Sequence, residues 1–514
     1  LVSAMTLGLT LAMAVPAMAC TSYYVGSECT ADGTTMYGRT EDTSSNWDKV
    51  FKVIEAEEVG ENAVYADPTG ATRFKAPIKV STTYRYTVTR DAEANDDGFF
   101  GEAGQNEVGV SMSATTSSSP ASAVRSKDAF VRGTGITEEN LLDYVLCQAS
   151  TAREGVELLK DVVTNIGAGE GNGLFIADNK EVWYVEILTG HQMCAVKMPS
   201  DKAAIIPNCF VIDVVDTNDC ENVICTDTLV SFAEENGFLV TAEEGTIDVK
   251  ASYAPSYTAG NADRIRGGEF LLSGIDSEEI YTVKSRDMFF DCEDVTLTDV
   301  YTLAGYRYEG MDFGSRRVNR QIGVSSTVEA HIMQITPDMP AEIATVQWMG
   351  MKSPAYTAMA PFYTAVMTDT PESWKVEAAK RNDDAAFWAS YDLYNICNNN
   401  QATIGVAVKD AWKVYMTKME ELQKKVNDRM AQKYKSDREN VSYYATELGI
   451  QAGEALTNYT KAMLLEAQAY VESGSEEPFV VSESFKDLSY KMSNVHPPQS
   501  QKGKDNNNGK GKNK

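Results

Sequence analysis

The chain has 514 residues, of which 43% are hydrophobic and 23% are charged, a composition typical of folded globular proteins rather than of disordered chains. Acidic residues outnumber basic ones by 74 to 46, and the net charge of -28 repels phosphate backbones and anionic membranes. Nucleic acid is therefore not an expected partner. The length leaves room for two or three domains with a sizeable core.

The chain opens with a predicted export signal. Residues 1–19 form an apolar run that ends in Ala17-Met18-Ala19, the small-x-small pattern that signal peptidase recognises. We expect this signal peptide to direct the protein through a bacterial secretory pathway to the periplasm, the cell surface or the medium. Cleavage leaves Cys20 as the first residue, while acylation of Cys20 and a retained anchor stay open as alternatives. No other apolar run reaches the length of about 18 residues that a membrane span needs.

The next part of the chain has the pattern of a mixed α+β fold. Short β-branched and aromatic runs, separated by Gly, Asn and Asp, alternate with fewer helical patterns. In residues 173–188, two apolar runs flank the turn pair Asp178-Asn179, which predicts a β-hairpin. Residues 138–163 carry a helical pattern. We take residues 20–369 as one domain.

Towards the end of the chain the pattern changes to that of long amphipathic helices. Apolar residues recur three and four positions apart from Trp412 to Met430, and a second helical stretch covers about 441–471. Residues 370–475 are expected to form a helical hairpin packed on the main domain, with its apolar stripe in the core. Residues 476–514 form an extension that ends in a Lys- and Asn-rich segment without apolar residues, which predicts a mobile tail.

The cysteines and histidines do not form the pattern of a metal site. No CxxC pair occurs, and His191, His331 and His496 lie far apart in the sequence, so neither zinc nor a Cys-His dyad is expected. Nine cysteines is an odd number, which leaves at least one of them unpaired in an oxidising compartment, and Cys20 is the natural candidate. We expect neither a metal nor an organic cofactor.

An N-terminal cysteine can supply both the nucleophile and the base of a hydrolase. A free α-amine has a pKa of about 7.7–8.0, so near neutral pH it can accept a proton from a thiol whose pKa is about 8.5. Arg39, Glu41 and Asp42 follow closely. On a strand Arg39 and Glu41 share one face and Asp42 the other, although a bend would bring Arg39 and Asp42 together near the amine. An arginine lowers the pKa of a neighbouring thiol and a carboxylate orients the ammonium; a surface charge cluster is the alternative reading.

These residues and several later segments resemble the dipeptidase A family of Ntn cysteine peptidases, in which the first residue of the mature chain is the nucleophile. The resemblance begins with Cys20-Thr21, the Asp32-Gly33-Thr34-Thr35 turn and Arg39-Thr40-Glu41-Asp42. It continues at residues 101–117, 169–192, 313–321 and 346–363. Because these segments occur in order over most of the chain, the series is far more specific than any one of them.

The resemblance implies roles for five residues. Cys20 is the nucleophile, and Arg39 and Asp42 line its pocket, as in the related bile-salt hydrolases and penicillin V acylases. Asn208 is similar to the asparagine that donates its side-chain amide to the oxyanion hole; a turn residue after a proline is the alternative. Such a donor suits a charge that appears only in the tetrahedral intermediate. Arg316 resembles the last arginine of the pocket.

The assignment of Arg316 and one further position of the oxyanion hole each have competing residues. A shift of the alignment by about one turn gives the place of Arg316 to Arg317 or Arg320. A second contributor to the oxyanion hole falls near Thr115 or Thr116, where the sequence departs from the related acylases.

The resemblance also implies a fold and a reaction. The fold is a four-layer αββα sandwich, with two antiparallel sheets between helices, Cys20 at the start of a central strand, and the C-terminal helical segment added. The reaction is hydrolysis of short peptides by a cysteine dipeptidase, through a thioester that water resolves. Expected partners are small peptides and signal peptidase, and assembly into homo-oligomers stays open. The alternatives are a bile-salt or penicillin V type acylase and a secreted binding protein on a catalytically dead scaffold.

Overall fold

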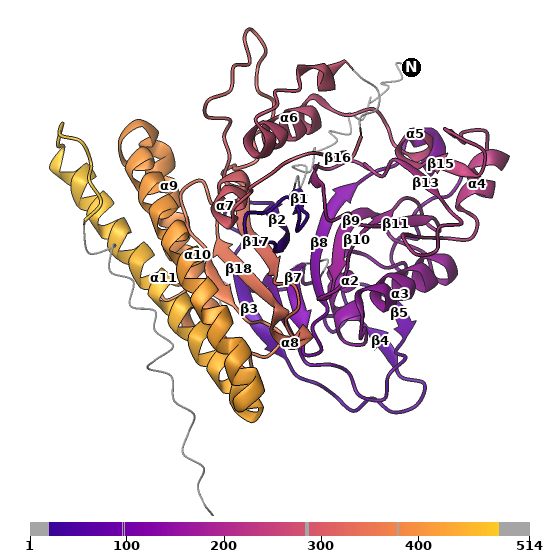
Figure 1. Ribbon diagram of the computed structural model, residues 1–514, viewed down its shortest axis with the longest axis horizontal. Helices are drawn as coiled ribbons and strands as arrows, with labels where there is room; N and C mark the ends of the chain where they lie inside the picture. Colours follow the sequence, from indigo (N-terminus) through magenta and orange to yellow (C-terminus); the bar gives the residue numbers. More distant parts are fainter. Residues whose placement is uncertain (1–19, 95, 97, 283–286, 378–379, 483–514) are drawn as a thin grey trace, which may run out of the picture.

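The structure of the protein is a computed structural model that describes residues 20–94, 96, 98–282, 287–377 and 380–482. The expected signal peptide and the Lys-rich tail lie outside the described residues. Two antiparallel sheets face each other in the middle of the molecule, with helices on both outer sides (Figure 1). The predicted α+β class and its four-layer arrangement are confirmed.

The first sheet has seven strands, and Cys20 stands directly before β1, an inner strand. The strand order is β16-β12-β1-β2-β17-β18-β19, and all neighbours are antiparallel. Its strands are β1 (Thr21–Val25), β2 (Thr35–Asp42), β12 (Ala203–Ile206), β16 (Phe289–Phe290), β17 (Thr327–Ile335), β18 (Thr345–Met351) and β19 (Ala360–Phe362).

The second sheet has eight strands and contains the predicted hairpin. The strand order is β14-β11-β10-β9-β8-β7-β6-β3, again antiparallel throughout. β9 and β10 pair on either side of Asp178-Asn179, which confirms the hairpin at 173–188. The strands are β3 (Lys49–Ile54), β6 (Tyr86–Asp91), β7 (Gly101–Asn106), β8 (Ser111–Ser118), β9 (Gly171–Ala177), β10 (Val182–Ile187), β11 (Met193–Lys197) and β14 (Val223–Cys225).

The helical pattern at 138–163 forms two helices, α2 (Glu138–Leu146) and α3 (Ala152–Asn165), which cover the second sheet. The break has a local cause. The side-chain oxygen of Thr151 accepts a hydrogen bond from the N–H of Glu154 at 3.1 Å, and threonine at this position starts a helix by satisfying such a donor.

The remaining elements lie around the two sheets. Two short two-stranded sheets pair β4 (Val64–Ala66) with β5 (Lys75–Pro77) and β13 (Val214–Asp216) with β15 (Thr246–Asp248). The other helices are α1 (Ser122–Arg125), α4 (Leu229–Glu235), α5 (Val249–Tyr253), α6 (Ala259–Ser273), α7 (Leu297–Ala304), α8 (Ala341–Ala344), α9 (Ala386–Asn399), α10 (Val406–Ser436) and α11 (Val441–Ser473). Short 3-10 turns lie at Glu278–Tyr281, Glu372–Trp374 and Arg438–Asn440, and a π-helical turn at Gln401–Gly405.

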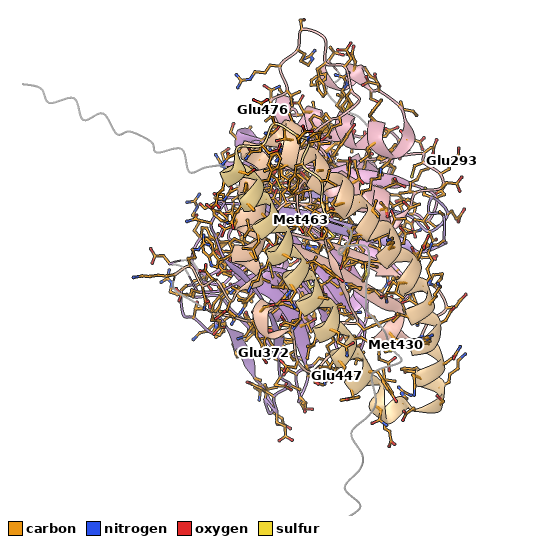
Figure 2. All side chains as sticks on the ribbon, turned by 90° about the vertical axis from the view of Figure 1, so that its left-hand side faces the viewer. Glu293, Glu372, Met430, Glu447, Met463 and Glu476 are labelled. Carbon is orange, nitrogen blue, oxygen red and sulfur yellow. The ribbon has the colours of Figure 1, made fainter. Side chains whose placement is uncertain are left out.

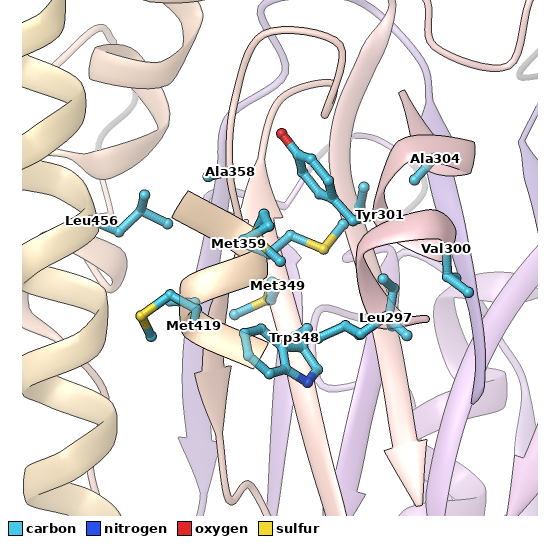
Figure 3. Packing of buried hydrophobic residues seen from close by; sticks show 14 of the residues in the cluster. Leu297, Val300, Tyr301, Ala304, Trp348, Met349, Ala358, Met359, Met419 and Leu456 are labelled. Carbon is cyan, nitrogen blue, oxygen red and sulfur yellow. The ribbon is translucent and has the colours of Figure 1, made fainter. Parts of the chain in front are cut away.

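The C-terminal helices pack on the outer side of the first sheet. The predicted amphipathic stretches fall within α10 and α11, which lie side by side in Figure 2 and carry the labelled Met430 and Met463. Apolar residues three and four apart form one stripe on a helix, and this stripe is buried. In the shared core, Trp348 of β18, Met419 of α10, Leu456 of α11 and the apolar side of α7 belong to one buried hydrophobic cluster (Figure 3). The boundary at residue 370 stays a prediction.

Lys352 is a buried lysine directly after β18. Its Nζ donates hydrogen bonds to the carbonyl oxygens of Ser45 at 2.7 Å and Ser325 at 3.0 Å, and it lies over the rings of Tyr391 and Tyr394. Burial lowers the pKa of Lys352 to about 7. In the unfolded chain a lysine has a pKa of about 10.4. Between these values the unfolded state holds a proton that the folded state has released, so this group makes the free energy of unfolding rise with pH.

The variant Lys352→Met is expected to lose this pH dependence. The unfolding free energy of the variant minus that of the wild type should be larger at pH 6.5 than at pH 9. This difference between the two proteins should change by about 2 kcal/mol over that range. Urea unfolding of both proteins at the two pH values measures it. A difference that does not change with pH would show that Lys352 keeps its proton in the folded state.

Candidate active site

The pairing of β1 places Cys20 between two polar residues. When the register of β1 with β2 is continued by one residue, Cys20 lies opposite Glu41. When the register of β1 with β12 is continued by two residues, Cys20 lies opposite Asn208 on the other side. Because side chains alternate across a strand, the side chains of Cys20 and Glu41 leave the same face of the sheet. This face is turned towards β8 of the second sheet.

The thiol of Cys20 contacts both members of a buried ion pair, Arg39 and Glu41. Its Sγ is 3.1 Å from Oε2 of Glu41 and 3.1 Å from Nη1 of Arg39, and the same Nη1 pairs with Glu41. Cys20 is only 2% exposed. Burial raises the pKa of the Cys20 thiol well above its usual value, the charge of Glu41 raises it further, and Arg39 opposes both. The thiol is therefore protonated near neutral pH and needs a base to become a nucleophile.

Arg39 is held by the second sheet. Its guanidinium donates to the carbonyl oxygens of Ala114 at 2.6 Å and Thr115 at 2.7 Å, and it pairs with Glu102. Consecutive carbonyls of a regular strand point in opposite directions, but β8 has a register shift here that lets both face one side chain. Glu102 also pairs with Lys49, and burial together with the charge of Glu41 raises the pKa of Glu102 to about 7.

Asp42 lies on the other face of β2, as the alternation of a regular strand predicts. Its Oδ2 accepts a hydrogen bond from Nη2 of Arg320 at 2.6 Å and its Oδ1 from the hydroxyl of Thr327 at 2.5 Å. Burial raises the pKa of Asp42, and Arg320 opposes this rise. The structure therefore places Arg39 at the thiol and pairs Asp42 with Arg320 on the opposite face.

Asn208 is joined to Cys20 by an arginine that the sequence analysis did not identify. Nη1 of Arg264 donates to the backbone oxygen of Cys20 at 2.6 Å and to Oδ1 of Asn208 at 2.9 Å. Its Nη2 donates to Oδ1 of Asn261, and Nδ2 of Asn208 donates to the backbone oxygen of Ser117. Burial lowers the pKa of Arg264 to about 10, with the charge of Arg320 as the second cause. One guanidinium thus fixes Cys20 and Asn208 relative to each other.

Arg316 does not join this group. It is exposed, and its guanidinium stacks on the ring of Tyr281 at 3.8 Å. Of the two other positions predicted from the sequence, Arg317 is exposed as well, whereas Arg320 reaches Asp42. In α6 the structure buries Asp263, Arg264 and Arg266, although charged residues on a helix usually face water, and no sequence pattern singled out Arg264.

The two positions predicted for a second oxyanion contributor lie near Cys20. The hydroxyl of Thr116 is 2.5 Å from that of Ser22, which is two residues after Cys20 on β1. The hydroxyl of Thr115 is hydrogen-bonded to Glu138, while its backbone oxygen accepts from Arg39. The structure therefore brings both threonines to the site.

A cavity of about 940 Å³ opens beside these residues. Asn208 and Ser117 line it together with the start of α2, including Glu138, and with Glu170. Its walls carry both apolar groups and polar or charged groups, so it suits a ligand of the size of a short peptide.

The described part of the chain contains no group of three or more His, Cys, Asp or Glu side chains that could hold a metal ion. The nine cysteines are free thiols in the structure. An unpaired state therefore does not distinguish Cys20 from the other eight. No helix within the described ranges is both long and apolar enough to cross a membrane.

Comparison with known proteins gives matches to a family profile, to curated proteins and to a solved structure. The profile of peptidase family C69 matches residues 19–264 and 290–414. Probable dipeptidase B of Streptococcus pyogenes serotype M1 is 32% identical over 416 residues, covering 77% of this chain and 82% of the relative. A probable dipeptidase of Salmonella dublin is 32% identical over 362 residues, covering 67% and 81%. A mutant conjugated bile acid hydrolase from Clostridium perfringens aligns in structure with a TM-score of 0.27 and 15% identity, covering 65% of this chain and 89% of that one.

Proposed function

Because the chain belongs to peptidase family C69, we propose that it is an exported cysteine dipeptidase whose nucleophile is the thiol of Cys20. The observation that carries this proposal is the position of the Cys20 thiol, which lies between the guanidinium of Arg39 and the carboxylate of Glu41 at the start of β1. The relatives named as probable dipeptidases support a dipeptide as the substrate.

In the proposed mechanism, signal peptidase cleaves after Ala19 and frees the α-amine of Cys20. This amine takes the thiol proton, and the guanidinium of Arg39 stabilises the thiolate that forms. The sulfur attacks the carbonyl carbon of the peptide bond, and the negative oxygen of the tetrahedral intermediate accepts hydrogen bonds from the amide of Asn208 and from a backbone N–H.

Collapse of the intermediate breaks the peptide bond. The α-ammonium of Cys20 returns its proton to the departing amine, which leaves as the second amino acid. Water then attacks the thioester with the α-amine as base, which releases the first amino acid and restores the thiol. Arg264 takes no part in proton transfer in this scheme. Its role is to hold the backbone of Cys20 and the side chain of Asn208 in place.

The test combines the mature N-terminus with a substrate panel. We expect N-terminal sequencing and intact mass of the active protein to show an unmodified Cys20 as the first residue. The same preparation is expected to hydrolyse dipeptides at least about 100-fold faster than conjugated bile salts or phenoxyacyl amides. Preference for one of these amides would instead support an acylase. A blocked or uncleaved Cys20, together with no hydrolysis in the panel, would support a binding protein on this scaffold.

A further inference from the structure

The wall of the cavity beside Asn208 holds three carboxylates and two guanidiniums that the mechanism does not use, those of Glu138, Glu139, Glu170, Arg125 and Arg132. Glu138, the first residue of α2, and Glu170, which directly precedes β9, both line the cavity. Oε1 of Glu170 accepts a hydrogen bond from the backbone N–H of Glu138 at 2.8 Å, so the two residues are neighbours. Glu138 is only 9% exposed. Buried carboxylates are rare unless they have a partner or a function.

Glu138 is connected to the nucleophile by a short series of contacts. Its Oε2 accepts hydrogen bonds from the hydroxyl of Thr115 and, at 3.4 Å, from that of Ser117. The backbone oxygen of Thr115 accepts from Nη1 of Arg39 at 2.7 Å, and this nitrogen is 3.1 Å from the sulfur of Cys20. Arg39 and Thr115 thus connect the carboxylate of Glu138 to the sulfur of Cys20.

A buried amide beside the pair points to a ligand with hydrogen-bond donors. Asn172 is 1% exposed, and its Nδ2 donates to Oε1 of Glu170 at 3.3 Å. Its Oδ1, in the same amide group, is buried and has no hydrogen-bond partner among the described residues. A buried acceptor without a partner costs free energy, so a donor from a bound molecule would relieve that cost.

A pair of neighbouring carboxylates favours a cation. Burial, followed by the charge of Glu170, raises the pKa of Glu138 well above its usual range. A cation bound beside the two carboxylates relieves the repulsion between them. An ammonium group carries one positive charge and three N–H donors, and Glu138, Glu170 and Asn172 offer three acceptors.

We propose that Glu138 and Glu170, with Asn172, bind the free α-ammonium group of the peptide substrate. This rests on the proposed function and assigns to it the residues that recognise an unblocked N-terminus. The α-amine of a peptide is one carbon away from its first carbonyl, and Glu138 is the carboxylate that Thr115 and Arg39 connect to Cys20. These glutamates act by binding and positioning the substrate and do not touch the reacting bond.

The test compares L-Ala-L-Ala with N-acetyl-L-Ala-L-Ala in the mature wild type, Glu138→Gln and Glu170→Gln. Glutamine keeps the size of the side chain and removes its charge. In the wild type, kcat/KM for the free dipeptide is expected to exceed that for the acetylated one by about 100-fold or more, and in each variant this ratio should fall about 10-fold or more. The loss should appear mainly in KM, because substrate and transition state carry the same ammonium. Glu157→Gln, which changes an exposed glutamate of α3, should keep the wild-type ratio.

A second measurement separates this proposal from the proposed function. Calorimetry of the two peptides with mature Cys20→Ala, whose glutamates are intact, should show binding of the free dipeptide at least about 10-fold tighter than of the acetylated one. Equal affinities, or an equal loss of both activities in Glu138→Gln and Glu170→Gln, would overturn the ammonium site. A wild type that hydrolyses neither peptide while Cys20→Ala still prefers the free one would overturn the dipeptidase activity and leave the ammonium site supported.

Discussion

Replacement of Cys20 by alanine is expected to lower kcat for dipeptide hydrolysis by about 10⁴-fold or more, because alanine has no atom that can form the thioester. Cys20→Ser keeps a hydroxyl at the same place. Its pKa is far above that of a thiol, so the α-amine can activate it only poorly and it should retain a small fraction of the activity. Steady-state kinetics with a dipeptide measure all three proteins, after intact mass shows that each begins at residue 20.

Cys147→Ala is the matched control, because Cys147 is also a buried cysteine. It lies at the C-terminal end of α2, where its Sγ is 3.4 Å from the backbone oxygen of Tyr144, and burial raises its pKa to about 12. We expect Cys147→Ala to keep kcat within about threefold and to lose about 1 kcal/mol of stability from the cavity that the sulfur leaves. Equal loss of activity in Cys20→Ala and Cys147→Ala would contradict the assignment of the nucleophile.

The sequence predicted those parts of the fold and of the site that depend on local patterns. The hairpin around Asp178-Asn179 and the helical stretches are written in short-range periodicity and turn residues. The contact between Arg39 and Glu41 could be predicted in the same way, because side chains two residues apart on a strand lie on one face. The contact of Glu41 with the thiol needed one further fact, the register of β1 against β2.

Contacts between distant segments were beyond the reach of the sequence. Arg264 is far from Cys20 in the chain, and only the packing of α6 against β12 brings it to the backbone of that residue. The choice among Arg316, Arg317 and Arg320 depended on how a loop folds over Asp42, which neither periodicity nor composition determines. Similarly, the sequence placed Glu138 only within a helical pattern. Its position beside Thr115 follows from the pairing of β8 and the packing of α2.

Arg264→Lys is expected to lower kcat/KM for dipeptides by about 100-fold. The guanidinium reaches the backbone oxygen of Cys20, the side-chain oxygen of Asn208 and Oδ1 of Asn261 at the same time. Lysine keeps the positive charge but offers a single nitrogen, so it cannot hold these three groups in one arrangement. The loss should appear mainly in kcat, because a displaced oxyanion donor weakens the binding of the transition state more than that of the substrate.

The same substitution should also lower stability. At least one buried oxygen is left without its donor, which costs about 1–3 kcal/mol. Urea unfolding of the mature protein measures this, and the kinetic loss should remain at temperatures where the variant is fully folded. Glu102, which pairs with Arg39, and Lys49, which pairs with Glu102, are unchanged in this variant, so a loss of kcat in the folded protein reports on the contacts of Cys20 and Asn208.

Arg316→Ala provides the comparison that decides between the two arginines. The structure places Arg316 on the surface against Tyr281, where its loss removes one exposed stacking contact and leaves the groups around Cys20 in place. We expect this variant to keep kcat/KM within about threefold of the wild type, because single surface changes seldom alter a distant site. If Arg316→Ala were inactive and Arg264→Lys active, the position predicted from the sequence would be the functional one, and the loop that carries Arg316 would have to close over Asp42 in the working enzyme.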